Sequence, residues 1–150
     1  MALLNWHCKK LTTLTTLQLY DIIAVRNEVF VVEQDCVYND ADGKDVDAYH
    51  LFAYENNKIA AYARLLAPNV AFTEASIGRV LTAKDVRKMG YGIKLIQKAV
   101  EQTISLYGEH DIKIGAQLYL KKFYESFGFK QTSQMYLEDG IEHIEMLLSV

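Results

Sequence analysis

A basic excess is missing from this sequence, since 16 Lys and Arg face 19 Asp and Glu and leave a formal net charge of −3. Proteins that bind the nucleic-acid backbone usually carry a basic surplus, so we expect no nucleic-acid partner. No run of about 18 apolar residues is present either, so no membrane span or membrane partner is expected. The two cysteines, Cys8 and Cys36, make no disulfide framework, and the first residues lack the charged and apolar regions of a signal peptide. We therefore expect a reduced, cytoplasmic protein.

What is present indicates one folded domain over residues 1–150. The 150 residues, 51% of them hydrophobic, are enough for a substantial core. No internal repeat or linker-like segment interrupts them. Apolar runs predict strands at 48–55 and 58–67, joined as a hairpin, and at 4–10, 75–82, 111–117 and 143–150, with a further strand after Phe129.

Two amphipathic patterns predict helices between these strands. The first helix would be capped by Thr12 or Thr13. Its apolar positions are Leu14, Leu17, Ile22, Val25 and Val29. The second would end at Gly108, with an apolar stripe of Ile93, Ile96, Val100 and Ile104. With a short third helix at 119–127, these elements predict an α+β fold with a mixed sheet.

The stretch VRKMGYGIKL places the motif R-x-x-G-x-G, formed by Arg87, Gly90 and Gly92, between a predicted strand and a predicted helix. A dinucleotide-binding fingerprint needs a third glycine, and a P-loop needs G-x-x-x-x-G-K-[ST], so neither matches. Two interpretations stay open from the spacing alone. One is a helix N-terminus whose free N–H groups, with Arg87 and Lys88, bind a phosphate. The other is a tight turn with solvated basic residues.

Together with IGRVLT upstream and FYESFGF downstream, this motif resembles the GNAT superfamily of acetyl-CoA-dependent N-acyltransferases. The segments VRNEVFVVEQ, DADGKD, GAQ and EDGIEHIEM resemble, more narrowly, its ElaA-like branch. The resemblance implies the GNAT fold, a mostly antiparallel mixed sheet of about six to seven strands flanked by helices, with strands four and five splayed. It also implies acetyl-CoA as the acetyl donor.

The resemblance implies a role for particular residues as well. The segment Arg87, Lys88, Met89, Gly90, Tyr91 and Gly92 would wrap the coenzyme A pyrophosphate. The end of strand four, Val80, Leu81 and Thr82, would bind the pantetheine and polarise the thioester through backbone N–H groups. Tyr124, in a Y-x-x-x-G-F context, would protonate the leaving thiolate, although a tyrosine buried in the core is the alternative. Gln117 stands where many family members carry an asparagine beside the coenzyme.

The acceptor side is less defined by the sequence. Candidates for the general base are Glu33, Glu74, Glu138 and His143, and a water chain without a dedicated base is the alternative. Arg26, Glu33 and Gln34 lie where the first helix meets the loop that borders the acceptor site in this fold. Their charged and amide groups suggest a polar, cationic acceptor. An Arg–Glu pair that ties the loop to the helix is an equal alternative for Arg26.

The sequence as a whole therefore predicts direct acetyl transfer to a primary amine, on a small molecule or a peptide. Two alternatives remain: an acyltransferase with another acyl donor, and a non-catalytic acetyl-CoA-binding regulator. The histidines share no metal-ligand spacing, so no metal is expected, and the acidic loop at 39–47 is expected to be a solvated turn or an acceptor-side lid. Cys36 is expected to be a plain thiol, and a homodimer is compatible with the sequence.

Overall fold

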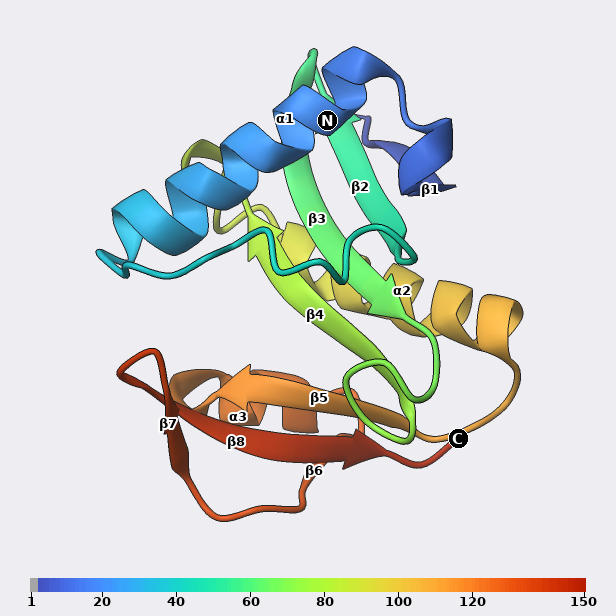
Figure 1. The fold of residues 1–150 in the computed structure, drawn as a ribbon, viewed down its shortest axis with the longest axis vertical. Helices are drawn as coiled ribbons and strands as arrows, with labels where there is room; N and C mark the ends of the chain where they lie inside the picture. The colour runs from blue at the N-terminus through green and yellow to red at the C-terminus, as the bar shows by residue number, and fades with distance from the viewer. Residues whose placement is uncertain (1–2) are drawn as a thin grey trace.

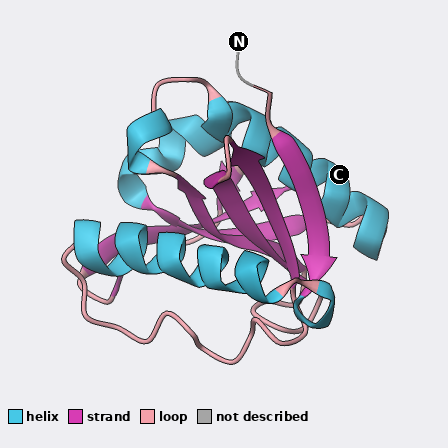
Figure 2. Ribbon diagram, turned by 90° about the horizontal axis from the view of Figure 1, so that it is seen from above, coloured by secondary structure: helices cyan, strands magenta, loops and turns pink. Residues whose placement is uncertain are grey.

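The fold, known from a computed structural model that describes residues 3–150, is built around one twisted sheet. The strands lie in the order β1-β2-β3-β4-β5-β8-β6, and β7 pairs with β8 outside this path. Helices cover both faces of the sheet (Figures 1 and 2). The α+β class with a mostly antiparallel mixed sheet is confirmed.

The first four strands lie side by side, each antiparallel to the next. They are β1 (Asn5–Lys10), β2 (Tyr49–Glu55), β3 (Lys58–Leu66) and β4 (Ala75–Thr82). Asn56 and Asn57 both have positive φ between β2 and β3, at +50° and +69°. Two such residues make the two-residue turn that matches the twist of a hairpin, which explains the asparagines.

The second half of the sheet is built on β5 (Ile112–Gln117), which runs antiparallel to β8 (Ile141–Leu148). The short strands β6 (Lys130–Gln131) and β7 (Tyr136–Glu138) also pair with β8. β5 pairs with β4 in parallel at only two positions, Ala75 with Ile112 and Ser76 with Lys113. Beyond them the two strands diverge (Figure 1), which confirms the predicted splay.

Two apolar cores hold the helices to opposite faces. The helix α1 (Thr16–Arg26) continues as a π-helical segment, Asn27–Glu33, and packs Ile22 and Val25 with Phe52 and Tyr62. On the other face α2 (Tyr91–Tyr107) and α3 (Lys121–Glu125) share a core with β3, β5 and β8. Short 3₁₀ segments lie at Leu11–Thr13, Lys84–Val86 and Leu118–Leu120. None of the helices in the described residues is long and apolar enough to span a membrane.

The start of α1 corrects the predicted cap. Thr13 belongs to the 3₁₀ segment, and Thr15 is the N-cap, accepting a bond from the Gln18 N–H while the Gln18 side chain accepts from the Thr15 N–H. Such a reciprocal capping box satisfies two N–H groups that lack helical partners. Leu17, predicted to be apolar-facing, is 74% exposed because the buried side of α1 begins only at Ile22.

The buried stripe of α2 also differs from the prediction. Ile93 is exposed, and the residues facing the sheet are Tyr91, Leu95, Ile96, Ala99 and Thr103. Ala99 and Thr103 are small, so the helix can lie close to the sheet on this side. The buried stripe is therefore shifted by one position from the predicted stripe of larger aliphatic side chains. Gly108, with φ +96°, ends the helix as predicted.

Candidate functional site

A cavity of about 860 Å³ lies where β4 and β5 diverge. It is lined by both strands and also by the π-helical segment after α1, the start of α2, the α3 region and the β7–β8 hairpin. A concave site of this size, with polar groups converging from several elements, is typical of a small-molecule site. The divergence therefore creates the candidate site directly.

A β-bulge shapes the β4 wall of this cavity. Arg64 pairs with Gly78 and Tyr62 with Leu81, so Arg79 and Val80 together oppose the single residue Ala63. Arg79 has φ +49°, the left-handed conformation found at bulges. From Ile77 onward no β5 residue pairs with β4, so within residues 3–150 the backbone groups of this edge have no strand partner. Val80, Leu81 and Thr82, predicted to bind pantetheine, all line the cavity there.

The N-terminus of α2 opens at the same end. Gly90 is its N-cap with φ +80°, and no side chain caps the first N–H groups. A Cβ at Gly90 would meet nothing within 4 Å, so packing does not require a glycine there. The positive φ is what favours glycine. Free N–H groups at a helix start attract anions. Gly92 lines the cavity, whereas Lys88, Met89, Gly90 and Tyr91, also predicted residues of this turn, do not.

Arg87 and Glu33, predicted as a phosphate contact and an acceptor-side residue, are brought together. The Arg87 guanidinium forms a double ion pair with the Glu33 carboxylate, with 2.8 Å between Nη2 and Oε1, and also donates to the Thr82 carbonyl. Both side chains line the cavity. The Arg87 hydrogen bond is the largest influence on Glu33 and lowers the pKa of that carboxyl. Arg87 is thus held at the cavity mouth, next to the end of β4.

Tyr124 projects from α3 into the cavity wall and is 6% exposed. No hydrogen bond joins its hydroxyl to another residue in the described part of the chain, although the ring packs edge-on against Phe123 and Phe129. Burial raises the pKa of Tyr124, so the hydroxyl keeps its proton at neutral pH. Gln117, at the end of β5, lines the same cavity. A buried, protonated phenol without an internal partner is available to a ligand.

Comparison with known proteins agrees with this geometry. A family model described as an acetyltransferase (GNAT) domain matches residues 17–150. The chain belongs to the GNAT acetyltransferase family.

Whole-length relatives narrow the position within the GNAT family. The protein ElaA of Escherichia coli is 36% identical over 150 residues, covering 99% of this chain and 98% of the relative. Its crystal structure superposes with a TM-score of 0.92 over 98% of this chain and 100% of that one. The UPF0039 protein sll0451 of Synechocystis is 41% identical over 98% of this chain and 96% of its own length. An acyl-CoA N-acyltransferase from Pseudomonas aeruginosa has a TM-score of 0.93 at 37% identity, over 98% and 100% of the two chains.

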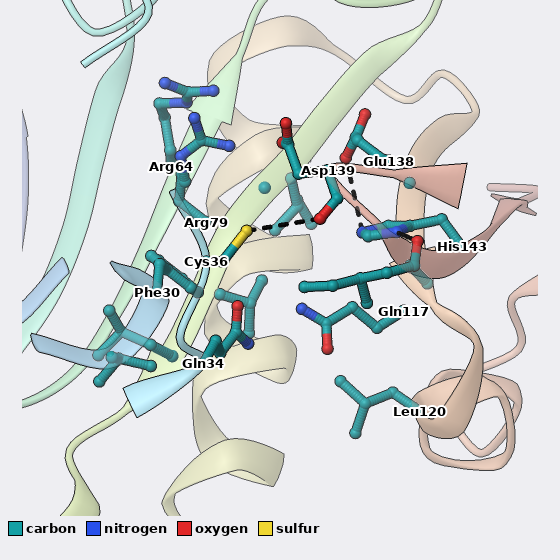
Figure 3. Close-up of a pocket in the computed structure, with 18 of the residues that line it drawn as sticks. Phe30, Gln34, Cys36, Arg64, Arg79, Gln117, Leu120, Glu138, Asp139 and His143 are labelled. Atoms are coloured by element: carbon teal, nitrogen blue, oxygen red, sulfur yellow. Dashed lines mark hydrogen bonds and ion pairs between the residues drawn. The ribbon is translucent and has the colours of Figure 1, made fainter. Parts of the chain in front are cut away.

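The far end of the GNAT cavity is formed by the β7–β8 hairpin (Figure 3). The His143 ring nitrogen Nε2 lies 3.5 Å from Oε2 of Glu138. The Cys36 thiol is buried and lies 3.6 Å from the Asp139 carbonyl oxygen. Gln34 completes the opposite wall. Three of the residues predicted on the acceptor side, Gln34, Glu138 and His143, therefore line the same cavity.

Two other predicted acceptor residues lie elsewhere. Glu74 precedes β4 at the closed end of the sheet, in a small hollow that it shares with Glu109, His110 and Asp111. The two strands pair at that end, so Glu74 does not reach the cavity. Arg26 is 3% exposed and does not line the cavity, because its guanidinium pairs with Asp40 and Asp45. It ties the loop to the helix, through two aspartates instead of a glutamate.

The acidic loop is not a solvated turn. Asp40, Asp42 and Asp45 alternate with Arg26, Arg64 and Arg79 in a closed ring, in which each carboxylate bonds two guanidiniums and each guanidinium bonds two carboxylates. The distances lie between 2.7 and 3.3 Å. Burial alone would raise the pKa of Asp42, but the hydrogen bonds and charges of the arginines outweigh it and lower that pKa to about 2. We call these six residues the charge ring.

No local pattern in the sequence indicates the charge ring. Its bonded arginine and aspartate partners are separated by 14 to 39 positions, and only the fold brings them together. Two members of the ring, Arg64 and Arg79, line the cavity (Figure 3). Neither was among the site residues predicted from the sequence. Among residues 3–150 no cluster of His, Cys, Asp and Glu has the arrangement of a metal site.

Proposed function

We propose that this protein transfers an acetyl group from acetyl-CoA to a primary amine by direct attack of the amine on the thioester. The observation that carries the proposal is the divergence of β4 and β5, which leaves one edge of β4 without a strand partner beside a cavity that also holds Tyr124. An extended pantetheine arm can pair with such an edge as a further strand would. The coenzyme diphosphate then falls at the N-terminus of α2.

The residues of the cavity fit this ligand at its two ends. An added Cβ at Gly90 would meet nothing within 4 Å, so a phosphate can approach the first N–H groups of α2. Arg87 adds a guanidinium beside them, and on binding the diphosphate competes with Glu33 for it. The thioester lies further along the β4 edge, close to Tyr124.

The chemistry follows from these positions. A neutral amine attacks the thioester carbonyl carbon, and the negative charge that develops on oxygen is stabilised by backbone N–H groups at the end of β4. The carbon–sulfur bond then breaks, and the leaving thiolate takes the proton of the Tyr124 hydroxyl. Tyr124 regains a proton from the substrate nitrogen or from solvent. Direct attack is favoured over an acyl-cysteine because the Cys36 thiol bonds the Asp139 carbonyl and, among the described residues, no basic side chain.

A steady-state assay of thiol release from acetyl-CoA, with a panel of small amines and peptide amines, tests this function. We expect turnover with at least one amine and a higher kcat/KM for acetyl-CoA than for longer acyl-CoAs. A preference for a long acyl chain would assign another donor. Coenzyme A binding without turnover on any amine would support a regulator that binds the coenzyme.

The phosphate contact is tested by calorimetry. Arg87→Ala should weaken binding of coenzyme A more than binding of a pantetheine fragment that lacks the phosphates. Lys84→Ala, which removes a cation from the neighbouring 3₁₀ segment, is the matched control and should leave both affinities unchanged. Equal losses for the two ligands in Arg87→Ala would exclude a phosphate contact.

A further inference from the structure

His143 occupies a defined place on the acceptor side of the cavity. On β8 it pairs with Gln117, the last residue of β5. It therefore lies at the end of the pairing between β5 and β8. The residue is 7% exposed and lines the cavity, as Figure 3 shows. It is therefore a titratable side chain that is shielded from bulk water but open to a ligand.

The local backbone decides which ring nitrogen carries the proton. Nδ1 lies 2.7 Å from the Ile141 carbonyl oxygen. A carbonyl can only accept a hydrogen bond, so Nδ1 must be the N–H donor. In neutral imidazole the lone pair is then on Nε2, the nitrogen that lies 3.5 Å from the Glu138 carboxylate.

The ring is held on its face as well. Tyr136 stacks on it with 5.9 Å between ring centroids and 28° between the planes. The Tyr136 hydroxyl in turn lies over Gly115, where an added Cβ would come within 3.1 Å of it. Glycine at position 115 therefore makes room for the tyrosine that positions the histidine. The other titratable groups around the ring are Asp139 in the turn, Cys36 bonded to its carbonyl, and Glu145 on β8, which pairs with Lys113.

In neutral imidazole the Nε2 lone pair and the Glu138 carboxylate are two acceptors side by side, and no residue among 3–150 places a donor between them. A group that donates hydrogen bonds to both acceptors would satisfy them. A substrate ammonium group, with three N–H bonds, is such a donor. The competing carboxylates are less suitable as bases. Glu33 is engaged by Arg87, Glu74 lies outside the cavity, and Glu138 itself is 60% exposed, so water competes for its carboxylate.

We propose that His143 accepts the proton of the substrate ammonium group through Nε2, with Glu138 drawing the cation in and Ile141, Tyr136 and Gly115 positioning the ring. This inference rests on the proposed acetyl transfer. The substrate R–NH₃⁺ gives one proton to Nε2 and becomes R–NH₂, whose lone pair forms the new bond to the acetyl carbon. The imidazolium then pairs with Glu138, and its proton leaves to solvent after product release.

The test compares His143→Asn with the wild type in kcat/KM for the amine between pH 6 and pH 10. The asparagine amide can still donate to the Ile141 carbonyl, because its nitrogen takes the place of Nδ1, but no lone-pair nitrogen remains at Nε2. We expect a loss of about 10²-fold near pH 7. The loss should shrink as the pH approaches the pKa of a primary amine, about 10, because the amine is then already neutral. His110→Asn, an exposed histidine outside the cavity, is the matched control.

Coenzyme A affinity and the midpoint of thermal unfolding should stay unchanged in His143→Asn, and added imidazole should restore part of its activity. His143→Gln is a second variant in case the first does not fold. Wild-type kcat/KM in the variants, or a loss that is the same at every pH and insensitive to imidazole, would overturn the role of His143 alone. Absence of amine turnover in the wild-type protein, by contrast, would contradict the proposed function.

Discussion

Removing one carboxylate from the charge ring should destabilise the fold strongly. Oδ1 of Asp45 accepts from Arg26 at 2.7 Å and from Arg64 at 3.0 Å. These arginines are 3% and 5% exposed, so neither can turn to water for a new partner. In Asp45→Asn the ring opens, and three guanidiniums share two carboxylates.

The magnitude follows from the partners that remain. Breaking a buried ion pair by removing one member costs about 3–5 kcal/mol, because the other charge stays buried. Here each arginine keeps one carboxylate, Asp40 for Arg26 and Asp42 for Arg64, so we expect a smaller loss than this range, about 2–3 kcal/mol. For a chain of this size that loss corresponds to a fall of roughly 5–10 °C in the midpoint of thermal unfolding.

Urea denaturation at pH 7 measures this loss as a change in the free energy of unfolding. Asp47→Asn is the matched control, since Asp47 lies two positions away, is exposed and forms no ion pair among the described residues. It should stay within about 0.5 kcal/mol of the wild type. If Asp45→Asn and Asp47→Asn were equally stable, the ring would not be a stabilising element, and the reasoning from burial would be refuted.

Three further outcomes are expected. The arginines lower the pKa of Asp42 from 3.8 to about 2, so its ionised form contributes about 2 kcal/mol to the free energy of unfolding. This contribution should be present above pH 4 and lost as the pH falls toward 2. In Asp42→Asn the free energy of unfolding should therefore change less with pH in this range. Gly90→Ala and Gly43→Ala place the same strain at φ +80° and +84°, so urea denaturation should show similar destabilisation, but only Gly90→Ala should weaken coenzyme A binding in calorimetry. Tyr124→Phe should lower kcat and kcat/KM about 10²-fold without changing coenzyme A affinity, whereas Tyr107→Phe, outside the cavity, should match the wild type.

The turn and helix start at residues 87–92 could be predicted because their signals are local. Arg87, Gly90 and Gly92 lie within six positions, and a helix that begins there needs no information from the rest of the chain. Tyr124 was found in the same way, from its place before Gly128 and Phe129. Backbone conformation explains why such motifs are short, since they encode a turn and the start of a helix.

Other local signals were present but were not used. Asp139 and Gly140, both with positive φ, form the two-residue turn of the β7–β8 hairpin, and an Asp-Gly pair between apolar positions predicts such a turn. β7 was nevertheless missed, and with it the stacking of Tyr136 on His143. Gln18, three positions after Thr15, likewise indicated the true cap of α1.

The charge ring could not be predicted, because its order depends on tertiary distances. The acidic loop contains four aspartates, and nothing in the sequence distinguishes Asp47, which stays in solvent, from Asp45, which bonds two arginines. Burial decides between them. From the sequence the loop was therefore expected to be a solvated turn or an acceptor-side lid.

The ring also explains how a strained backbone persists in the middle of β4. Arg79 has φ +49°, a conformation that costs a residue with a Cβ about 1 kcal/mol relative to glycine. Its guanidinium donates to Asp40 at 2.8 Å and to Asp42 at 3.3 Å. These bonds hold the side chain on the loop and so hold the bulge. Because the bulge lies on the strand that leaves β5, the loop helps to keep the cavity open.

Two substitutions at this position separate the strain from the lost ion pairs. Arg79→Ala and Arg79→Gly remove the same bonds, but only alanine keeps a Cβ in the left-handed conformation. In an ordinary strand glycine is less stable than alanine by about 0.5–1 kcal/mol. At a retained bulge the order should reverse, with Arg79→Gly more stable by about 1 kcal/mol in urea denaturation and nearer to the wild type in coenzyme A affinity. If Arg79→Ala were the more stable variant, β4 would have relaxed to a regular strand, and the bulge would depend entirely on the arginine.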